Sequence, residues 1–257
     1  MTACALRQDA DILMLGGFPL LKTTSLELTQ QLAEALKTHE QYVLVFANTN
    51  FIVKCQPLQK AMQEANTIIV NDGIGVDIGT WMIHREKFPE NLNGTDFIPH
   101  YLHHVKDKGR VFLLGAKPGI ALRAATTLEN DFSVNVVGTA DGYGQANNTN
   151  QLIAEINSSG ANIILVAMGN PWQEKWILDH RHELKASVFI GVGALLDFLA
   201  GEKPRAPGIV QKLRLEWFYR LCLEPTRLMR RYTLDIVIFL TLCLRTEKWR
   251  KHNEQLR

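Results

Sequence analysis

The stretch NIILVAMGNPWQEKWILDH, residues 162–180, contains the unit that decides the fold of this chain. Its first six residues, 162–167, form a continuous apolar run, which is typical of a strand buried on both faces of a parallel sheet. The loop MGNPWQE, 168–174, then leads into a helical pattern that extends from 172 to 182. A strand, a loop and a helix in this order predict an α/β fold with a mostly parallel sheet.

The same alternation continues along the chain. Five further apolar runs predict strands, and five stretches between them have a helical pattern. Strands are expected at 42–47, 67–70, 110–114, 135–138 and 187–192. Helices are expected at 25–38, 57–65, 95–106, 118–130 and 150–158.

The composition is that of an ordinary globular protein. The 257 residues are 46% hydrophobic and 21% charged, which excludes a disordered chain, and no fixed-period repeat is present. No apolar run reaches the roughly 20 residues of a membrane-spanning helix, and acidic residues before the first apolar run argue against a secretory signal. The cysteines have no disulfide or zinc spacing, so reduced thiols in a cytoplasmic protein are expected. They are Cys4, Cys55, Cys222 and Cys243.

The charge is distributed unevenly. The net charge is only +2, but residues 203–257 contain 13 Lys and Arg against 5 Asp and Glu, which leaves a balance of −6 on the rest. Because the Pro/Gly-rich stretch GEKPRAPG, 201–208, separates the two parts, we expect an α/β core at 1–202 and a C-terminal appendage at 203–257. A basic segment of this kind is typical of contact with phosphates, nucleic acid or an anionic membrane surface.

The appendage has a helical pattern with apolar and basic faces, and Pro225 is expected to break or kink the helix. Its apolar segment 234–244 is too short to span a bilayer but long enough to lie in a membrane interface. Two alternatives stay open, a membrane-docking appendage and a helical hairpin that packs on the core. Its aromatic residues are mixed with aliphatic runs, which favours lipid over nucleic acid.

Each predicted strand is followed by a loop rich in Gly, Asn or Asp. Ligands of parallel sheets bind beyond the carboxyl ends of the strands, where small residues allow backbone N–H groups to surround them. Six such loops in one chain predict a pocket, although none has the spacing of a dinucleotide fingerprint or a P-loop. They are ANTN (47–50), NDGIG (71–75), GAKPG (115–119), ADGYG (140–144), MGNPWQE (168–174) and GVGALLD (191–197).

Taken together, these motifs resemble the WecG/TagA/CpsF glycosyltransferases of bacterial cell-surface polysaccharide assembly. The resemblance extends from about residue 42 to 231 and includes NGTD (93–96), RAP (205–207) and LEWFYRLCLEPTR (215–227). It implies a Rossmann-like α/β core with an appendage that closes the active site at the membrane. It also implies inverting transfer of a sugar from a UDP-sugar to an undecaprenyl-diphosphate-linked sugar, without a metal or other cofactor.

Inverting transfer needs a base that takes a proton from the acceptor hydroxyl. Asp72 matches the catalytic carboxylate proposed for the family, and Gln173 matches a polar active-site position of its MGxPxQE motif. The residues by themselves leave two structural interpretations open. Asp72 would then be an Asx-turn acid that supports the loop 73–75, and Gln173 a helix first-turn residue after Pro171.

The remaining candidates divide into substrate-binding and diphosphate-binding residues. Lys117 is a candidate contact for the nucleotide, and Asp197, a charge in an apolar run, needs a partner such as Arg205 or a ligand hydroxyl. Arginine suits diphosphate because its guanidinium bonds phosphate oxygens bidentately. The expected substrate-binding residues are Asn48, Asn50, Asn71, Asn91, Asn93, Asp96, Gly115, Lys117, Asp141, Tyr143, Met168, Gly169, Gly191, Gly193 and Asp197. The expected diphosphate-binding residues are Arg205, Arg220, Arg227 and Arg230.

Two positions depart from the family pattern. Many members carry Arg at the position of Asn91 and Glu at the position of Asn50, and both are neutral amides here. The loss of two charges fits a neutral hexose such as the glucose of xanthan-type exopolysaccharide members, while a donor of the UDP-N-acetylmannosamine type stays open.

The sequence therefore predicts a UDP-sugar-dependent hexosyltransferase, attached peripherally to the inner face of the cell membrane. Its expected partners are a polyprenyl-diphosphate-linked acceptor and an anionic membrane surface, with no nucleic acid; a homo-oligomer is open. Two other functions remain as alternatives, an α/β nucleotide-binding enzyme of other chemistry and a nucleic-acid-binding protein that uses the basic segment. No metal site is expected, because the helical spacing of His100, His103 and His104 lacks a nearby acid.

Overall fold

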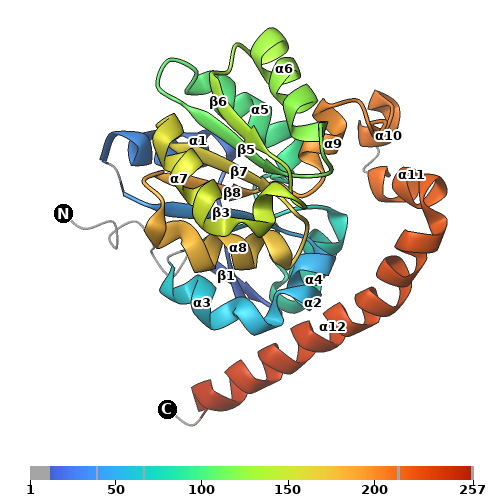
Figure 1. Cartoon of the computed structure of the whole chain (residues 1–257). Helices are drawn as coiled ribbons and strands as arrows, with labels where there is room; N and C mark the ends of the chain where they lie inside the picture. The colour runs from blue at the N-terminus through green and yellow to red at the C-terminus, as the bar shows by residue number, and fades with distance from the viewer. Residues whose placement is uncertain (1–11, 39, 66, 213–214, 256–257) are drawn as a thin grey trace.

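Six parallel strands form the central sheet of the protein (Figure 1). The computed structural model describes residues 12–38, 40–65, 67–212 and 215–255. Every pairing in this sheet is parallel, which confirms the predicted fold class. In the order β4-β3-β8-β7-β5-β6, the strands are β4 (Ile68–Asn71), β3 (Tyr42–Ala47), β8 (Val188–Gly191), β7 (Ile163–Ala167), β5 (Val111–Gly115) and β6 (Val136–Ala140).

Helices cover both faces of the sheet, because successive side chains of a strand point to opposite faces. On β3, Leu44 and Phe46 pack into one apolar cluster, whereas Val43 and Val45 pack into the other. The first face carries α1 (Ser25–Thr38), α5 (Gly94–His104), α6 (Ile120–Phe132) and α9 (Leu195–Leu199). The second carries α2 (Thr49–Lys54), α3 (Gln59–Glu64), α4 (Ile74–His84), α7 (Thr149–Ser159), α8 (Trp172–His180) and α12 (Pro225–Gln255).

Some elements of the second face lie outside the sequence prediction. An antiparallel hairpin of β1 (Ile12–Leu15) and β2 (Phe18–Leu21) buries Leu15 and Phe18 in that face. Helix α2 begins directly after β3, and helix α4 begins inside the NDGIG motif. Because Gly75 and Gly79 lower the helix propensity of α4, the sequence pattern does not reveal this helix.

The C-terminal segment is helical, and its last helix packs on the second face. It consists of α10 (Gly208–Lys212), α11 (Glu216–Leu223) and α12, and the break between the last two falls at Pro225, as predicted. Helix α12 runs along α2 and α4 (Figure 1) and buries Phe239 and Cys243 in the second apolar cluster. A Cβ on Gly79 of α4 would lie 2.6 Å from the Phe239 ring, so this close packing requires glycine.

The opposite face of α12 stays exposed, including Leu234, Val237 and Ile238. The segment therefore packs on the core and still presents apolar side chains outward. Of the helices in the described ranges, none is both long and apolar enough to cross a membrane.

We expect Phe239→Ala to lower the free energy of unfolding by about 3 kcal/mol, because a buried aromatic ring would be replaced by a cavity. Urea denaturation followed by circular dichroism measures the change. Val237→Ala is the matched control on the same helix, since Val237 is 63% exposed. Equal effects of the two substitutions would contradict the packing of α12 on the core.

Candidate active site

The loops that follow the six strands lie at one edge of the sheet, because the strands are parallel. Asn48 follows β3 and Asp72 follows β4 at one end of this edge. Met168 follows β7 and Asp141 follows β6 toward the other end, with the loop after β8 between the two groups. The structure thus brings the residues of the six sequence motifs to a common edge.

Asp72 is held at the end of β4 by its neighbour after β3. Its backbone N–H donates to the carbonyl oxygen of Ala47 at 2.9 Å, and its Oδ2 accepts from Nδ2 of Asn48 at 3.2 Å. The Oδ1 atom of Asn48 is already used, because it accepts from the backbone N–H of Phe51 at the start of α2. The amide of Asn48 therefore presents its N–H group to the half-buried carboxylate of Asp72.

Two asparagines shape the loop around Asp72. The Oδ1 atom of Asn91 accepts from the backbone N–H of Gly73 at 2.8 Å. Asn71 is fully buried, and its Nδ2 donates to Oδ1 of Asp77 and to the carbonyl oxygen of Glu90. Both side chains stabilise the loop, and contact of either with a substrate stays a prediction.

Gln173 connects the loops after β7 and β8. Its Oε1 accepts from the backbone N–H of Gly169 at 3.1 Å and from that of Gly193 at 3.0 Å. Its Nε2 donates to Oδ1 of Asn170 at 3.2 Å. A Cβ on Gly191 would lie 2.8 Å from Nε2 of Gln173, so this glycine leaves room for the amide. Gln173 is only 3% exposed, and its polar atoms bond the loops around the candidate site.

A buried carboxyl group lies behind Gln173. Oε1 of Glu174 accepts from Nε2 of Gln173 at 2.7 Å, and Oε2 lies 3.7 Å from Sγ of Cys55. Burial raises the pKa of Glu174 to about 7, because desolvation penalises the charged form more than these hydrogen bonds favour it. Burial and the nearby carboxyl group also raise the pKa of the Cys55 thiol far above its ordinary value. Near pH 7 the carboxyl group of Glu174 is therefore about half protonated, and the thiol of Cys55 is neutral.

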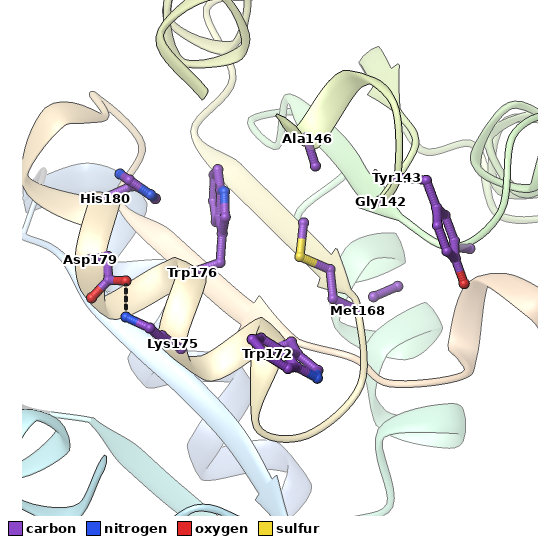
Figure 2. A pocket seen from close by; sticks show the side chains of 11 residues that line it. Gly142, Tyr143, Ala146, Met168, Trp172, Lys175, Trp176, Asp179 and His180 are labelled. Atoms are coloured by element: carbon purple, nitrogen blue, oxygen red, sulfur yellow. Dashed lines mark hydrogen bonds and ion pairs between the residues drawn. The ribbon is translucent and has the colours of Figure 1, made fainter. Parts of the chain in front are cut away.

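A cavity of about 520 Å³ lies at the other end of the edge, between α8 and the loops after β5, β6 and β7 (Figure 2). Met168 lies between Tyr143 and Trp172 in this view, and these two aromatic side chains are 60% and 67% exposed. Asp141 fixes the loop after β6, because its Oδ1 accepts from the backbone N–H groups of Tyr143 and Gly144. The cavity therefore offers exposed aromatic rings on a fixed backbone.

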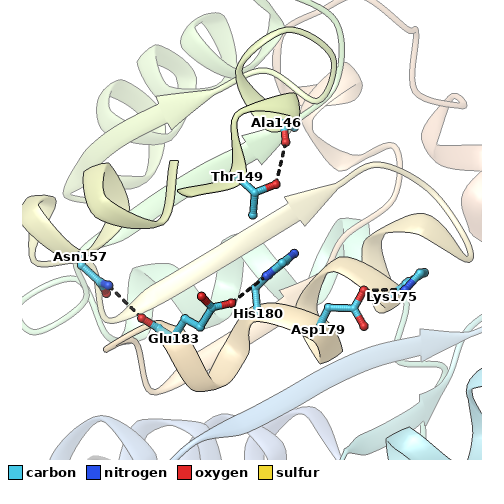
Figure 3. Close-up of polar contacts among 7 residues, drawn as sticks. All are labelled: Ala146, Thr149, Asn157, Lys175, Asp179, His180 and Glu183. Carbon is cyan, nitrogen blue, oxygen red and sulfur yellow. Dashed lines mark hydrogen bonds and ion pairs between the residues drawn. The ribbon is translucent and has the colours of Figure 1, made fainter. Parts of the chain in front are cut away.

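Polar side chains on the outer wall of the cavity pair along α8 and with the turn that follows it (Figure 3). Nζ of Lys175 lies 2.6 Å from Oδ2 of Asp179, and Nδ1 of His180 lies 3.0 Å from Oε1 of Glu183. Both pairs are partly exposed, so their contribution to stability is small. They shape the wall of the cavity.

Arg205, the first of the residues expected to bind diphosphate, lies near the start of the C-terminal segment. Arg205 pairs with Asp96 on α5, and Asn93 caps the same helix. The expected pairing of Asp197 with Arg205 is wrong, because Nζ of Lys203 lies 3.3 Å from Oδ2 of Asp197. The turn at 200–203 places Lys203 beside the carboxylate of Asp197. Arg205 lies further along the chain and contacts Asp96 on α5 instead.

The other predicted residues have varied surroundings. The Arg220 guanidinium lies 4.8 Å from the ring centroid of Phe198, and the side chains of Arg227 and Arg230 lie outside the described residues. Lys117 is exposed after β5 and is not part of the cavity wall. Asn50 is half-buried in the first turn of α2. Gly115 ends β5.

The sequence did not single out Trp172, Trp176 or His180, which line the cavity. Trp172 could have been chosen from the sequence, because it follows Pro171 in the strand-exit loop and begins α8. Over the ranges that the structure describes, no group of three or more His, Cys, Asp and Glu side chains is arranged to hold a metal ion.

The parallel sheet, its polar strand-exit loops and the cavity at their edge define an α/β protein of the kind that binds ligands beyond the carboxyl ends of its strands. Residues 13–254 match the model of the glycosyl transferase WecG/TagA/CpsF family, and the chain belongs to that family. Membership implies glycosyl transfer in the assembly of cell-surface polymers, with a nucleotide-sugar donor and a lipid-linked acceptor.

One solved structure is similar over part of the chain. The crystal structure of nicotinate phosphoribosyltransferase from Vibrio cholerae aligns with 67% of this chain and 47% of that chain, at 14% sequence identity and a TM-score of 0.24. A likeness at this level carries no argument about the site.

The raised pKa of Glu174 predicts a pH-dependent stability. The folded protein keeps the proton of Glu174 up to a pH of about 7, whereas the unfolded chain releases it near the ordinary glutamate pKa. The free energy of unfolding therefore decreases as the pH rises between these two values. Glu174→Gln removes the titration, so the variant should gain about 2 kcal/mol relative to the wild type between pH 5 and pH 8. Urea denaturation across this range measures the difference.

Glu155→Gln, at an exposed position of α7, is the control and should show no such gain. A difference between the Glu174→Gln variant and the wild type that stays constant with pH would contradict the burial of an ionisable Glu174.

Proposed function

We propose that the protein is an inverting, metal-independent hexosyltransferase. It moves a sugar from a UDP-sugar onto an undecaprenyl-diphosphate-linked sugar in cell-surface or exopolysaccharide assembly. The observation that carries this proposal is the carboxylate of Asp72, held by Asn48 at the edge of the sheet in a chain of this family.

Asp72 acts as the general base in this proposal. A base must accept a proton from the acceptor hydroxyl while that oxygen attacks the anomeric carbon of the donor. Nδ2 of Asn48 donates a hydrogen bond to Oδ2 of this carboxylate. This contact orients the carboxylate of Asp72 at the edge of the sheet.

The donor nucleotide occupies the cavity between α8 and the loops after β5, β6 and β7. Tyr143 and Trp172 present exposed rings there, and rings of this kind stack with nucleobases. Lys117, exposed directly after β5, is the candidate cation for the donor diphosphate. The sugar then points along the edge, past the loops joined by Gln173, toward Asp72.

The acceptor diphosphate meets the C-terminal segment. Arg220 lies on α11 against Phe198, and the sequence adds Arg227 and Arg230 on α12. The balance of +8 in residues 203–257 supports attachment to an anionic membrane at the inner face of the cell. We therefore retain 1–202 as the catalytic core and 203–257 as the appendage that brings it to its lipid-linked acceptor.

The donor sugar is proposed to be a neutral hexose. Asn50 and Asn91 stand where many members carry charged residues, and Asn91 uses its Oδ1 atom to hold Gly73 beside Asp72. A neutral site fits glucose better than a sugar acid, and a screen of UDP-sugars with synthetic lipid-diphosphate-linked monosaccharides decides between donors.

Asp72→Asn should lower sugar transfer by about 10²-fold or more, because the amide keeps the size of the side chain but cannot accept the proton. The assay follows UDP release with the best donor and acceptor of the screen. UDP affinity and the urea midpoint should stay unchanged. Asp131→Asn, at an exposed position of α6, is the matched control. Near-normal transfer by the Asp72→Asn variant would remove Asp72 from the mechanism.

Tyr143→Ala and Trp172→Ala should each weaken UDP binding by about tenfold, since base–aromatic stacking contributes about 1–3 kcal/mol. Isothermal titration calorimetry with UDP measures the affinity. Trp81→Ala is the control, because this exposed tryptophan lies on α4, beyond the other end of the edge. Unchanged affinity in both cavity variants would place the nucleotide elsewhere.

A further inference from the structure

An exposed apolar stripe runs along α4, a helix of the core and not of the appendage. Four large side chains form it, and their spacing of i, i+4, i+7 and i+8 places them on one face of the helix. They are Ile74, Ile78, Trp81 and Met82, which are 37%, 49%, 47% and 43% exposed. Four exposed apolar side chains on one helix face are typical of an interaction surface.

The other faces of α4 are already covered. Val76 and Thr80 are fully buried toward the core, and Gly79 lies against Phe239 of α12. The packing of α12 therefore leaves the stripe of Ile74, Ile78, Trp81 and Met82 exposed. Figure 1 shows α12 passing beside α4 on the same side of the sheet.

The side chains of the stripe and its surroundings suit an anionic lipid surface. The guanidinium of Arg85 lies 4.8 Å from the ring centroid of Trp81, which combines an aromatic ring with a cation at one end of the stripe. Tryptophan is enriched at membrane interfaces, where its ring lies at the level of the headgroups. Helix α12, which packs on α4, belongs to the segment with 13 basic against 5 acidic residues.

We propose that the α4 stripe is a membrane-contact surface that enters the interface of an anionic lipid bilayer. The stripe begins at Ile74, two residues after Asp72. Contact of α4 with lipid therefore brings the candidate base to the membrane surface, where a lipid-linked acceptor has its diphosphate. The link to catalysis rests on the proposed function, and the lipid contact extends the membrane attachment proposed there for residues 203–257 to a helix of the core.

The test uses the full-length chain and vesicles of phosphatidylcholine with phosphatidylglycerol. Ile78→Glu and Trp81→Glu place a carboxylate on the stripe, where it is repelled by anionic headgroups and costly to bury in lipid. Each variant should lower vesicle affinity at least about tenfold in sedimentation, with an unchanged urea midpoint and unchanged UDP binding. Leu122→Glu is the matched control, because Leu122 is 63% exposed on α6, on the opposite face of the sheet.

Wild-type vesicle affinity in both stripe variants would overturn the proposal, as would an equal loss in the Leu122→Glu control. A wild-type dimer that the stripe variants convert to a monomer would also overturn it, because a second copy would then cover the stripe. Trp81→Ala, which removes the ring without adding charge, should weaken binding less than Trp81→Glu does. Since sedimentation needs neither donor nor acceptor, failure of the transfer assay leaves this result interpretable.

Discussion

The geometry of the candidate site depends on the side-chain amide of Gln173. Its oxygen accepts two backbone N–H groups from different loops, those of Gly169 after β7 and Gly193 after β8. Neighbouring parallel strands are joined by crossover connections and not by hairpin turns. The loops at their ends are therefore not hydrogen-bonded to one another by strand pairing. A buried side chain that bonds both loops fixes their relative position. Glu174 then holds the amide in the orientation that this requires, through its contact with Nε2 of Gln173.

The carboxyl group of Glu174, which holds the amide of Gln173, changes its protonation state near pH 7 because it is buried. A charged carboxylate at 1% exposure pays a large desolvation cost, and a raised pKa is the consequence. The neighbouring thiol of Cys55 supplies a weak donor and no cation. Burying this acid costs stability, and the hydrogen bond that it accepts from Gln173 fixes the amide that joins the two loops.

Much of the fold and part of the site could be predicted from the sequence. Apart from the half-buried β6, the strands of the central sheet are buried on both faces, and their continuous apolar runs made the parallel arrangement predictable. Strand β3 and helix α1 have their expected bounds. Helix α4 was hidden because Gly75 and Gly79 resemble loop glycines, although Gly79 serves the packing of Phe239. The partner of Asp197 could not be predicted, because the choice between Lys203 and Arg205 depends on a turn that no residue pattern specifies.

The arrangement of the loops along this edge also explains how a water-soluble nucleotide-sugar and a lipid-linked acceptor could meet in the proposed reaction. The cavity lies by β5, β6 and β7, whereas Asp72 lies by β3 and β4, and the loop after β8 separates them. A nucleotide-sugar bound at one end must extend across that loop to present its anomeric carbon at the other. Helices α4 and α12 lie at the Asp72 end, so in the proposed reaction the acceptor would approach from the side opposite to the nucleotide. The loop held by Gln173 would then border both proposed binding sites, and its fixed position would align the donor carbon, the acceptor oxygen and the base.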